Sequence, residues 1–408
     1  MKAFVIAGGL PQIELIKQLK ARGITTVMAD GNNNALAKPY ADVFYHIPIF
    51  DINAVLDVAV REKVDFIITV CADQVLLVVA EVSEMLGLPF YLDYKTAQNV
   101  SDKLKMKAIF KANGIPTSNY LQLESFDSEA LSDLRFPMVV KPVDAYSSKG
   151  VRRADNITEL EKFYKEAKQI SRCGGVIIED YCKGEEISVD AFVTNGKAKI
   201  LCVSNSDKIL DEGRFVIFRG RYPAHTSDIV LKKIEIIAQK IADAFGLVNC
   251  PLLIQMIDRG EDVSVLEFCA RTGGNMKWLL IKYSCGVDVI SAAIDLSLGI
   301  EPQIEPKLTE NAIVVNDFIY CKPGIYYRLE GFEQLKKQGL LKEYFALRPS
   351  GMKTVGVNSS SDRIAGITMT ADTVVEFNNI HQKVVDTVRI LDPEGNDIMR
   401  HDLLPDLQ

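Results

Sequence analysis

Short apolar runs alternate with amphipathic segments along the first part of the chain. Residues 3–8, 25–30 and 64–70 are apolar runs of strand length, and residues 11–23 and 51–63 between them place apolar side chains at helical spacing. Strands that alternate with helices in this way are typical of βαβ units, in which helices cover a parallel sheet. The pattern therefore predicts a parallel α/β domain at the N-terminus.

The pattern changes near residue 100. One helix is predicted to begin at Ser101 or Asp102 as N-cap, because apolar residues at helical spacing follow these residues. Strand-like runs dominate from about 120 to 205, and Asn195-Gly196 between two alternating runs indicates a hairpin. The centre of the chain is therefore expected to be a largely antiparallel α+β region.

The second half continues with mixed elements. Residues 228–247 predict an amphipathic helix, and residues 252–271 predict a second hairpin that turns at Arg259-Gly260. The last hundred residues mix strands, turn-rich segments and a short helix around 331–339. We expect them to form a compact cap on the core.

Composition and charge narrow the class of protein. The chain has 408 residues, of which 48% are hydrophobic and 25% charged, which is typical of a soluble globular protein of about two to four domains. The net charge is −7 without long runs of one sign, which argues against a nucleic-acid or membrane-surface partner. No signal peptide or membrane span is predicted. Eight scattered cysteines without a CxxC pair favour a reduced, cytoplasmic protein.

The stretch FPMVVKPVDAYSSKGV carries the first candidate chemistry. Lys141 ends an apolar strand, and the small, polar residues Ser147, Ser148, Lys149 and Gly150 follow it. A lysine and a loop of this kind could close over phosphates, with backbone N–H groups and hydroxyls as donors. The alternative is a lysine that reaches water from a strand end, followed by an ordinary surface loop.

The stretch IIEDYCKGEEISVD carries the second. Glu179 ends one apolar strand and Glu186 begins the next, with Cys182 between them. The two acids could accept hydrogen bonds from an exocyclic amine and from ribose hydroxyls, and the backbone near Cys182 could read the edge of a base. A hairpin with solvated charges explains the same residues equally well.

The third candidate is the hairpin LLIQMIDRGEDVSVLEFCARTGGN. Gln255 and Glu267 lie on its two arms, which are otherwise largely apolar, so an inward polar residue needs a partner. Two oxygen ligands that face each other suit Mg²⁺, which takes few protein ligands and completes its shell with water and phosphate oxygens. Arg271 follows and could brace a phosphate. A charged hairpin edge would explain the charges but not the apolar flanks.

Taken together, the three stretches resemble the ATP-grasp superfamily in order and spacing over about 200 residues. The resemblance implies that Lys103 and Lys141 contact nucleotide phosphates, that the loop at 146–150 covers them, and that Arg271 and Lys141 are catalytic. It also implies an adenine- and ribose-binding segment and a metal-binding pair. The residues that it assigns to these two roles are Glu179, Asp180, Tyr181, Cys182 and Glu186 for the nucleotide, and Gln255 and Glu267 for Mg²⁺ or Mn²⁺.

The resemblance also implies a domain organisation. It predicts an α/β protein with an ATP-grasp fold: a Rossmann-like parallel βαβ domain at 1–98 and an ATP-grasp domain at 99–305. A mobile lid subdomain is expected at about 115–182, and a C-terminal α+β domain at 306–408. One position departs from the family pattern, because Cys269 replaces the usual Asn two residues after the metal glutamate. Since Mg²⁺ prefers oxygen ligands, the second metal ion could be held more weakly than in the family. A non-catalytic ATP-binding protein is therefore an alternative interpretation of the sequence.

The residues that would bind the other substrates are less marked. Gly8-Gly9 is not followed by a G-x-G-x-x-G pattern, which disfavours a nicotinamide cofactor. Asp73, with Gln74 beside it, follows a strand where such sheets bind ligands. The cationic residues Arg219, Arg221 and His225, and separately Arg363, could bind a carboxylate or phosphate. A solvated edge explains both sets equally well.

The implied reaction is ATP-dependent activation of a carboxylate as an acyl phosphate, which an amine then attacks. The partners would be a small-molecule carboxylate and an amine, and similar proteins are often homodimers. The favoured relatives are the L-amino-acid ligases and the single-ATP-grasp relatives of carbamoyl phosphate synthase. Phosphoribosylglycinamide synthetase, another purine-pathway enzyme or a carboxylate–thiol ligase remains an alternative, and the residues do not name the substrates.

Overall fold

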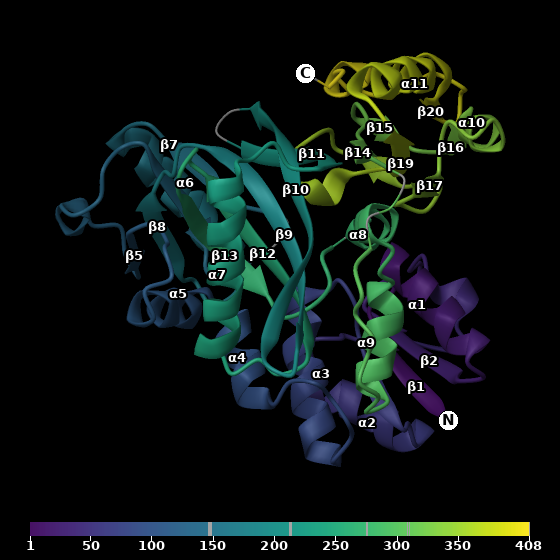
Figure 1. Ribbon diagram of the computed structural model, residues 1–408, viewed down its shortest axis with the longest axis horizontal. Coiled ribbons are helices and arrows are strands. Elements are labelled where there is room, and N and C mark those ends of the chain that lie inside the picture. Colours follow the sequence, from purple (N-terminus) through teal and green to yellow (C-terminus); the bar gives the residue numbers. More distant parts are fainter. Residues whose placement is uncertain (146–148, 212–213, 275, 308, 310, 408) are drawn as a thin grey trace.

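The computed structural model describes residues 1–145, 149–211, 214–274, 276–307, 309 and 311–407. A small parallel sheet near the N-terminus, a large antiparallel sheet in the centre and a C-terminal cap follow one another along the chain (Figure 1). This arrangement confirms the α/β N-terminal region and the antiparallel centre that the hydrophobic pattern predicts. The residue numbers at which the domains divide remain predictions.

The N-terminal sheet has four parallel strands in the order β3-β2-β1-β4. Asp51 accepts hydrogen bonds from the backbone N–H groups of Asn53 and Ala54, so it caps the second helix as an N-cap should. The helix that precedes residue 102 was not expected from the sequence. The elements of this part are β1 (Lys2–Ile6), α1 (Leu10–Ala21), β2 (Thr25–Asp30), η1 (Lys38–Tyr40), β3 (Val43–His46), α2 (Ile52–Glu62), β4 (Phe66–Ile68), α3 (Asp73–Leu86) and α4 (Tyr94–Ser101).

The next segment folds into the region expected to be a lid. Asp102 is the N-cap of α5 and accepts from the backbone N–H groups of Leu104 and Lys105, as predicted. The helix α6 was missed, although Asn156 caps it and its buried residues are spaced as on one helix face. The elements are α5 (Lys103–Ala112), β5 (Tyr120–Leu123), η2 (Glu129–Leu131), β6 (Met138–Pro142), β7 (Arg152–Ala154), α6 (Ile157–Ile170) and β8 (Val176–Asp180).

Two long hairpins form one end of the large sheet, in the order β13-β12-β9-β10. Asn195 and Gly196 both have positive φ, 49° and 76°, which fits the tight turn that this pair predicts between β9 and β10. The second hairpin joins β12 to β13, also as predicted. The elements are β9 (Glu185–Thr194), β10 (Lys197–Asp211), β11 (Arg214–Tyr222), α7 (Asp228–Ala244), β12 (Cys250–Asp258), β13 (Val263–Cys269), α8 (Lys277–Cys285) and α9 (Val289–Ser297).

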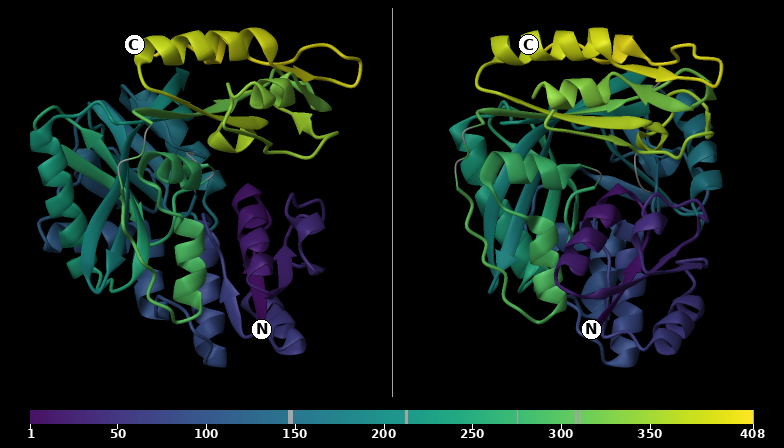
Figure 2. Two further views of the ribbon diagram at one scale, coloured as in Figure 1. Left: turned by 45° about the vertical axis from the view of Figure 1, so that its right-hand side comes forward. Right: turned by 90° about the vertical axis from the view of Figure 1, so that its right-hand side faces the viewer.

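The cap shares its sheet with the centre of the molecule. β14 pairs with β11 on one side and with β19 on the other, so the large sheet continues into the cap, and α11 lies on the outer side (Figure 2). The elements are β14 (Ile313–Ile319), β15 (Gly324–Ile325), β16 (Arg328–Glu330), α10 (Phe332–Lys337), β17 (Glu343–Ala346), β18 (Lys353–Thr354), η3 (Ser360–Asp362), β19 (Ala365–Ala371), α11 (Val374–Thr387), β20 (Arg389–Leu391) and η4 (His401–Leu403).

The helix α9 ties the central region back to the N-terminal domain. The Arg22 guanidinium forms a salt bridge with Asp295 at 2.5 Å, and the Gln18 amide donates a hydrogen bond to Asp288. Apolar side chains of α1, α8 and α9 share one buried cluster. The N-terminal sheet is thereby fixed against the large sheet, and its strand ends lie beside the site described next. In the described ranges no helix combines the length and apolar character that crossing a bilayer needs.

Candidate active site

A first cavity, with an empty volume of about 850 Å³, lies between the lid region and the β9–β13 part of the large sheet. Most nucleotide residues expected from the sequence line it. They are Lys103, Lys141, Lys149, Glu179, Asp180, Tyr181, Cys182 and Glu186, together with Gln255 and Glu267. Gly150 is not part of the lining but follows Lys149 directly, and Ser147 and Ser148 lie outside the described residues.

Glu179 is held between two lysines at the wall of this cavity. Its carboxylate oxygens lie 2.8 Å from Lys107 Nζ and 2.6 Å from Lys141 Nζ, and the Ser118 hydroxyl donates to it at 3.0 Å. Burial alone would raise the pKa of Glu179, but the charges of the two ammonium groups outweigh it and lower the pKa to about 2. The Glu179 carboxylate therefore anchors Lys141. The sequence had led us to expect that this carboxylate accepts a hydrogen bond from the exocyclic amine of a base.

Lys107 was not singled out in the sequence. It is almost fully buried, and its ammonium group donates to the Thr117 hydroxyl at 2.9 Å besides pairing with Glu179. It follows Lys103 by four residues on α5, so both lysines face the same side of that helix. That spacing was the available signal for a second lysine on the face of α5 that carries Lys103, although Lys107 itself lines neither cavity.

Two further residues of the cavity come from the hairpin β10–β11. Lys208 Nζ bonds the Glu186 carboxylate, and Phe215 stacks on Tyr181 with ring centroids 6.3 Å apart and planes inclined by 16°. Both residues line the cavity. Lys208 lies two residues after Ser206 on the cavity face of β10, whereas a register shift in β11, at Phe218, precedes Phe215. Single-sequence patterns reveal neither the cavity face of β10 nor this shift, so neither residue was predicted.

The expected metal pair lies across the second hairpin. Gln255 and Glu267 are direct partners in the β12–β13 register, and Glu267 Oε2 lies 3.2 Å from Lys103 Nζ. Burial acts to raise the pKa of Glu267, but the charges of Lys103 and Lys141 outweigh it, so the pKa is lowered and the group is a carboxylate. The Gln255 amide donates to Glu186 at 3.3 Å, which leaves its oxygen free to face a cation.

These two side chains fit a divalent cation that is also held by phosphate. Both offer oxygen, one is ionised, and they stand opposite each other. Over the described ranges, no cluster of three or more His, Cys, Asp and Glu side chains could hold a metal ion. A cation here would therefore take the rest of its ligands from water and phosphate oxygens.

A second, larger cavity with an empty volume of about 2170 Å³ meets the first. Its lining comes from the N-terminal strand ends, the large sheet and the cap. Four residues line both cavities, namely Lys103, Ala145, Gln255 and Glu267. The expected metal pair and Lys103 thus stand at the junction of the two spaces.

Arg271 and Asp73 meet in the wall of this second cavity. The Asp73 carboxylate forms an ion pair with the Arg271 guanidinium, which also donates to the Thr272 carbonyl at 2.6 Å and to Cys269 Sγ at 3.6 Å. Asp73, at the start of α3, was expected to contact substrate, and in the structure it orients Arg271. The side chain of Gln74 lies outside the described part of the chain.

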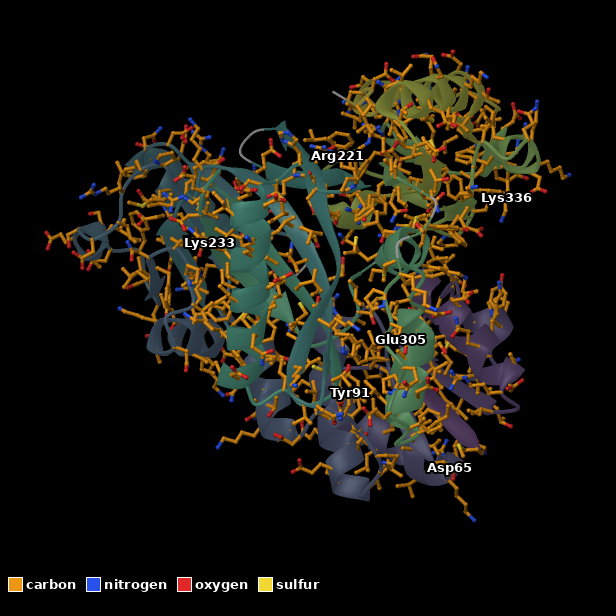
Figure 3. All side chains as sticks on the ribbon, viewed as in Figure 1. Asp65, Tyr91, Arg221, Lys233, Glu305 and Lys336 are labelled. Atoms are coloured by element: carbon orange, nitrogen blue, oxygen red, sulfur yellow. The ribbon has the colours of Figure 1, made fainter. Side chains whose placement is uncertain are left out.

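Arg219 and Arg221 do not reach either cavity, which corrects the prediction that they bind substrate. Gly220 between them lines the second cavity, so the two arginines point to the opposite face of β11. Arg219 is fully buried in a salt bridge with Asp317, at 2.5 Å and 3.0 Å. Arg221 pairs with Asp207 at 3.2 Å, and Figure 3 places it far from Tyr91, whose hydroxyl donates to Ala270 beside Arg271.

Replacing Arg221 with alanine is therefore expected to leave the site intact. Its partly exposed salt bridge with Asp207 contributes at most about 1 kcal/mol to stability. Steady-state kinetics, with ADP release as the readout, should give kcat and KM within about twofold of wild type. A rise in KM of tenfold or more would show that Arg221 contributes to substrate binding after all.

Arg363, by contrast, lies beside the second cavity. It lines the second cavity and is only 4% exposed. Its guanidinium donates to the Tyr320 hydroxyl at 3.2 Å and to the Ile217 carbonyl at 2.9 Å, and it lies 3.7 Å from the centre of the Phe318 ring. Within the described ranges no carboxylate forms a salt bridge with it. A buried cation with neutral partners favours an anionic ligand beside it.

Comparison with known proteins agrees with this geometry. Residues 134–278 match the ATP-grasp domain family. Among curated proteins, the formate-dependent phosphoribosylglycinamide formyltransferase of Mannheimia haemolytica is 26% identical over 256 residues. These residues make up 60% of this chain and 62% of that protein, so the match spans less than two thirds of the relative.

Two solved structures resemble the whole chain. The L-amino acid ligase from Bacillus licheniformis has a TM-score of 0.80 at 20% identity, and the match covers 96% of this chain and 98% of that one. The biotin carboxylase domain of 2-oxoglutarate carboxylase from Hydrogenobacter thermophilus, in complex with MgADP, ADP and bicarbonate, has a TM-score of 0.78 at 16% identity, covering 99% and 92%. At these identities the likeness shows the fold. The chain is an ATP-grasp domain protein with the ATP-grasp fold, related to these enzymes.

Proposed function

We propose that this protein is an ATP-dependent ligase that joins a carboxylate to an amine and releases ADP and phosphate. The observation that carries the proposal is the junction of the two cavities at Lys103, Gln255 and Glu267. A nucleotide in the first cavity would place its terminal phosphate at this junction. A carboxylate in the second cavity would then meet that phosphate in line, which is what phosphoryl transfer to a carboxylate needs.

The bond changes follow from this placement. A carboxylate oxygen forms a bond to the γ-phosphorus as the bond to ADP breaks, which gives an acyl phosphate. The amine nitrogen then attacks the acyl carbon, phosphate leaves, and the nitrogen loses a proton. Lys103 and Lys141 donate to phosphate oxygens, and Arg271, oriented by Asp73, faces the charge that develops. Mg²⁺, held by Gln255 and Glu267, would neutralise charge on the phosphate oxygens.

Arg363 supports a carboxylate in the second cavity. Its buried guanidinium lacks an acidic partner among the described residues, and a substrate carboxylate would provide one. The names of the relatives agree with chemistry of this kind, because they include an L-amino acid ligase and a phosphoribosylglycinamide formyltransferase. An amino acid or a phosphorylated amine is therefore the proposed class of substrate, bound as a small molecule without nucleic acid or membrane. A homodimer, as named for the biotin carboxylase domain from Hydrogenobacter thermophilus, remains part of the proposal.

The test is ADP release from MgATP by the purified protein. L-amino acids and phosphorylated amines are supplied singly and in pairs, and the Glu267→Ala variant is the control. We expect release that depends on a particular pair and that disappears in the variant. Release with one carboxylate alone would support acyl-phosphate formation. Equal release with every compound, or with none although ATP binds, would contradict the ligase proposal.

A second candidate, a non-catalytic ATP-binding protein, is favoured by Cys269. Burial raises the pKa of its thiol well above the usual value, so it stands as a neutral thiol two residues after Glu267. A neutral thiol is a poor ligand for a hard cation, whereas the asparagine of the family pattern offers oxygen.

The Cys269→Asn variant separates the two candidates. For a ligase we expect turnover in both forms, with the half-saturating Mg²⁺ concentration lower in the variant by on the order of tenfold, because an oxygen ligand is added. The measurement is ADP release as a function of Mg²⁺ concentration, with Cys173→Ser as the control, because Cys173 is exposed and lines neither cavity. Turnover that exists only in Cys269→Asn would identify the natural protein as non-catalytic.

A further inference from the structure

Lys277 forms a polar cluster on the floor of the second cavity that the proposed chemistry does not use. It stands at the start of α8, lines the cavity, and has 16% of its side chain exposed. Its ammonium group bonds the Ser204 hydroxyl and lies 3.4 Å from Asp190 Oδ2. An ammonium group has three donors, and these two partners leave one for the cavity.

Asp190 is buried beneath Lys277. It is 2% exposed, and neither of its carboxylate oxygens has a well-formed hydrogen bond in the described part of the chain. Burial raises its pKa, while the charge of Lys277 opposes that rise. A carboxylate is costly at such a position unless it serves a nearby cation. Asp190 is thus placed to hold the Lys277 ammonium group at one point of the cavity floor.

The turn before α8 is packed closely on the pair. A Cβ atom on Gly273 would lie 2.8 Å from Asp190 Oδ1 and 2.8 Å from Lys277 Cβ. Only glycine allows the turn to press the lysine stem against the acid at this distance. The backbone, as well as the ion pair, therefore fixes the direction of the lysine.

The strand register gives the distance from this pair to the metal pair. Ser188 of β9 is the partner of Gln255, and Asp190 is the partner of Leu253, two residues further along. At about 3.4 Å per residue, Asp190 lies about 7 Å along the strand from the level of Gln255. Ser188, at the level of Gln255, and Ser206 of β10 line the cavity with small polar side chains. The space between the junction and Lys277 thus suits a molecule of amino-acid size.

We propose that Lys277 binds the anionic group of the amine substrate, a carboxylate or a phosphate, with Asp190 as its positioning residue. The inference rests on the proposed ligase function and names the class of its acceptor. The attacking nitrogen must come within about 3–3.5 Å of the acyl carbon at the junction. An anionic group two to four bonds from that nitrogen, the carboxylate of an α-amino acid or the phosphate of a phosphorylated amine, would then extend toward Lys277.

The test compares ligand binding in matched variants. Lys277→Met alone leaves Asp190 buried without a cation, so the double variant Asp190→Asn/Lys277→Met removes both charges and protects the fold. Lys282→Met is the control, because Lys282 is an exposed lysine on the same helix. Thermal stabilisation in the presence of MgADP is titrated with the standard L-amino acids, with their carboxamides, and with phosphoethanolamine and phosphoserine.

We expect one or more anionic amines to bind the wild type and the Lys282→Met control equally. In the double variant their half-saturating concentration should rise by roughly tenfold to a hundredfold, the effect of losing a charge-assisted hydrogen bond. The carboxamide should bind the wild type more weakly than the amino acid, and the double variant should not distinguish them. A preference for amino acids identifies a carboxylate, and a preference for the phosphorylated amines identifies a phosphate. Asp190→Asn alone should reduce the same discrimination, whereas a merely structural role would lower stability without changing it.

The outcomes separate this inference from the proposed function. ADP release is measured on the same samples. If the double variant binds every anionic amine as tightly as wild type, or if none binds the wild type, the Lys277 subsite is wrong, whatever the turnover. If binding depends on Lys277 but ADP is never released, the subsite stands and the ligase proposal fails.

Discussion

Replacing Glu267 with alanine is expected to lower kcat for ADP release by roughly a hundredfold to a thousandfold, the usual effect of removing one preorganised electrostatic contact to a transition state. Glu267 is the ionised member of the pair that faces the junction of the two cavities, and Lys103 lies 3.2 Å from it. Without this carboxylate, the cation loses its charged protein ligand and Lys103 loses the group that positions it. Steady-state ADP release at saturating MgATP measures the effect.

Glu261→Ala is the matched control for this prediction. Glu261 is exposed in the turn of the same hairpin, so its loss should leave kcat within about twofold of wild type. Circular dichroism and the midpoint of urea unfolding should show that Glu267→Ala remains folded. Full activity in a folded Glu267→Ala variant would remove the metal pair from the proposed mechanism.

Replacing Glu179 with glutamine is expected to lower the free energy of unfolding by about 3–5 kcal/mol, because it leaves two buried ammonium groups without their shared carboxylate. Lys107 and Lys141 are both less than 10% exposed and both pair with Glu179. Urea unfolding at neutral pH measures the change. A second variant, Glu179→Gln/Lys107→Met, removes one of the two cations and should recover part of the loss. A change below about 1 kcal/mol would mean that water reaches the cluster and screens it.

The same cluster predicts an acid dependence of stability. The pKa of Glu179 is about 2 in the folded protein, below its usual value of 4.5. A carboxyl group with a lowered folded pKa contributes stability that is present above the unfolded pKa and is lost as pH falls through the folded pKa. The contribution of Glu179 should therefore fade between pH 4.5 and about pH 2. The difference in unfolding free energy between wild type and Glu179→Gln should shrink over that range.

The sequence contained most of the information for the nucleotide cavity. The residues of that cavity come from strand ends and from hairpins whose turns are marked locally, such as Asn195-Gly196. Once the hairpin β12–β13 is recognised, alternation along its arms brings Gln255 opposite Glu267. The ATP-grasp likeness of these stretches then predicted their roles toward the nucleotide and the metal, and most of the described residues so assigned line one cavity.

The residues that were missed or misplaced depend on long-range geometry. Phe215 reaches the first cavity beyond a register shift in β11, and Lys208 reaches it from a face of β10 that no local pattern marks. Arg219 and Arg221 were expected in the substrate site, but their place on a strand beside Gly220 directs them to the opposite face. The sequence shows that both side chains are positively charged, but it does not show on which face of the sheet they lie. Asp190 looks in the sequence like an ordinary strand residue, and only its burial beneath Lys277 distinguishes it.

The wall shared by the two cavities has a consequence for inhibitor design. Because Lys103, Ala145, Gln255 and Glu267 border both spaces, a nucleotide and an amino acid bound at once would meet end to end at these residues. One molecule that joins an adenosine phosphate to an amino acid through a short tether could then occupy both spaces. Binding of its first half would hold the second half at an effective concentration in the millimolar range, so the affinities of the halves would combine.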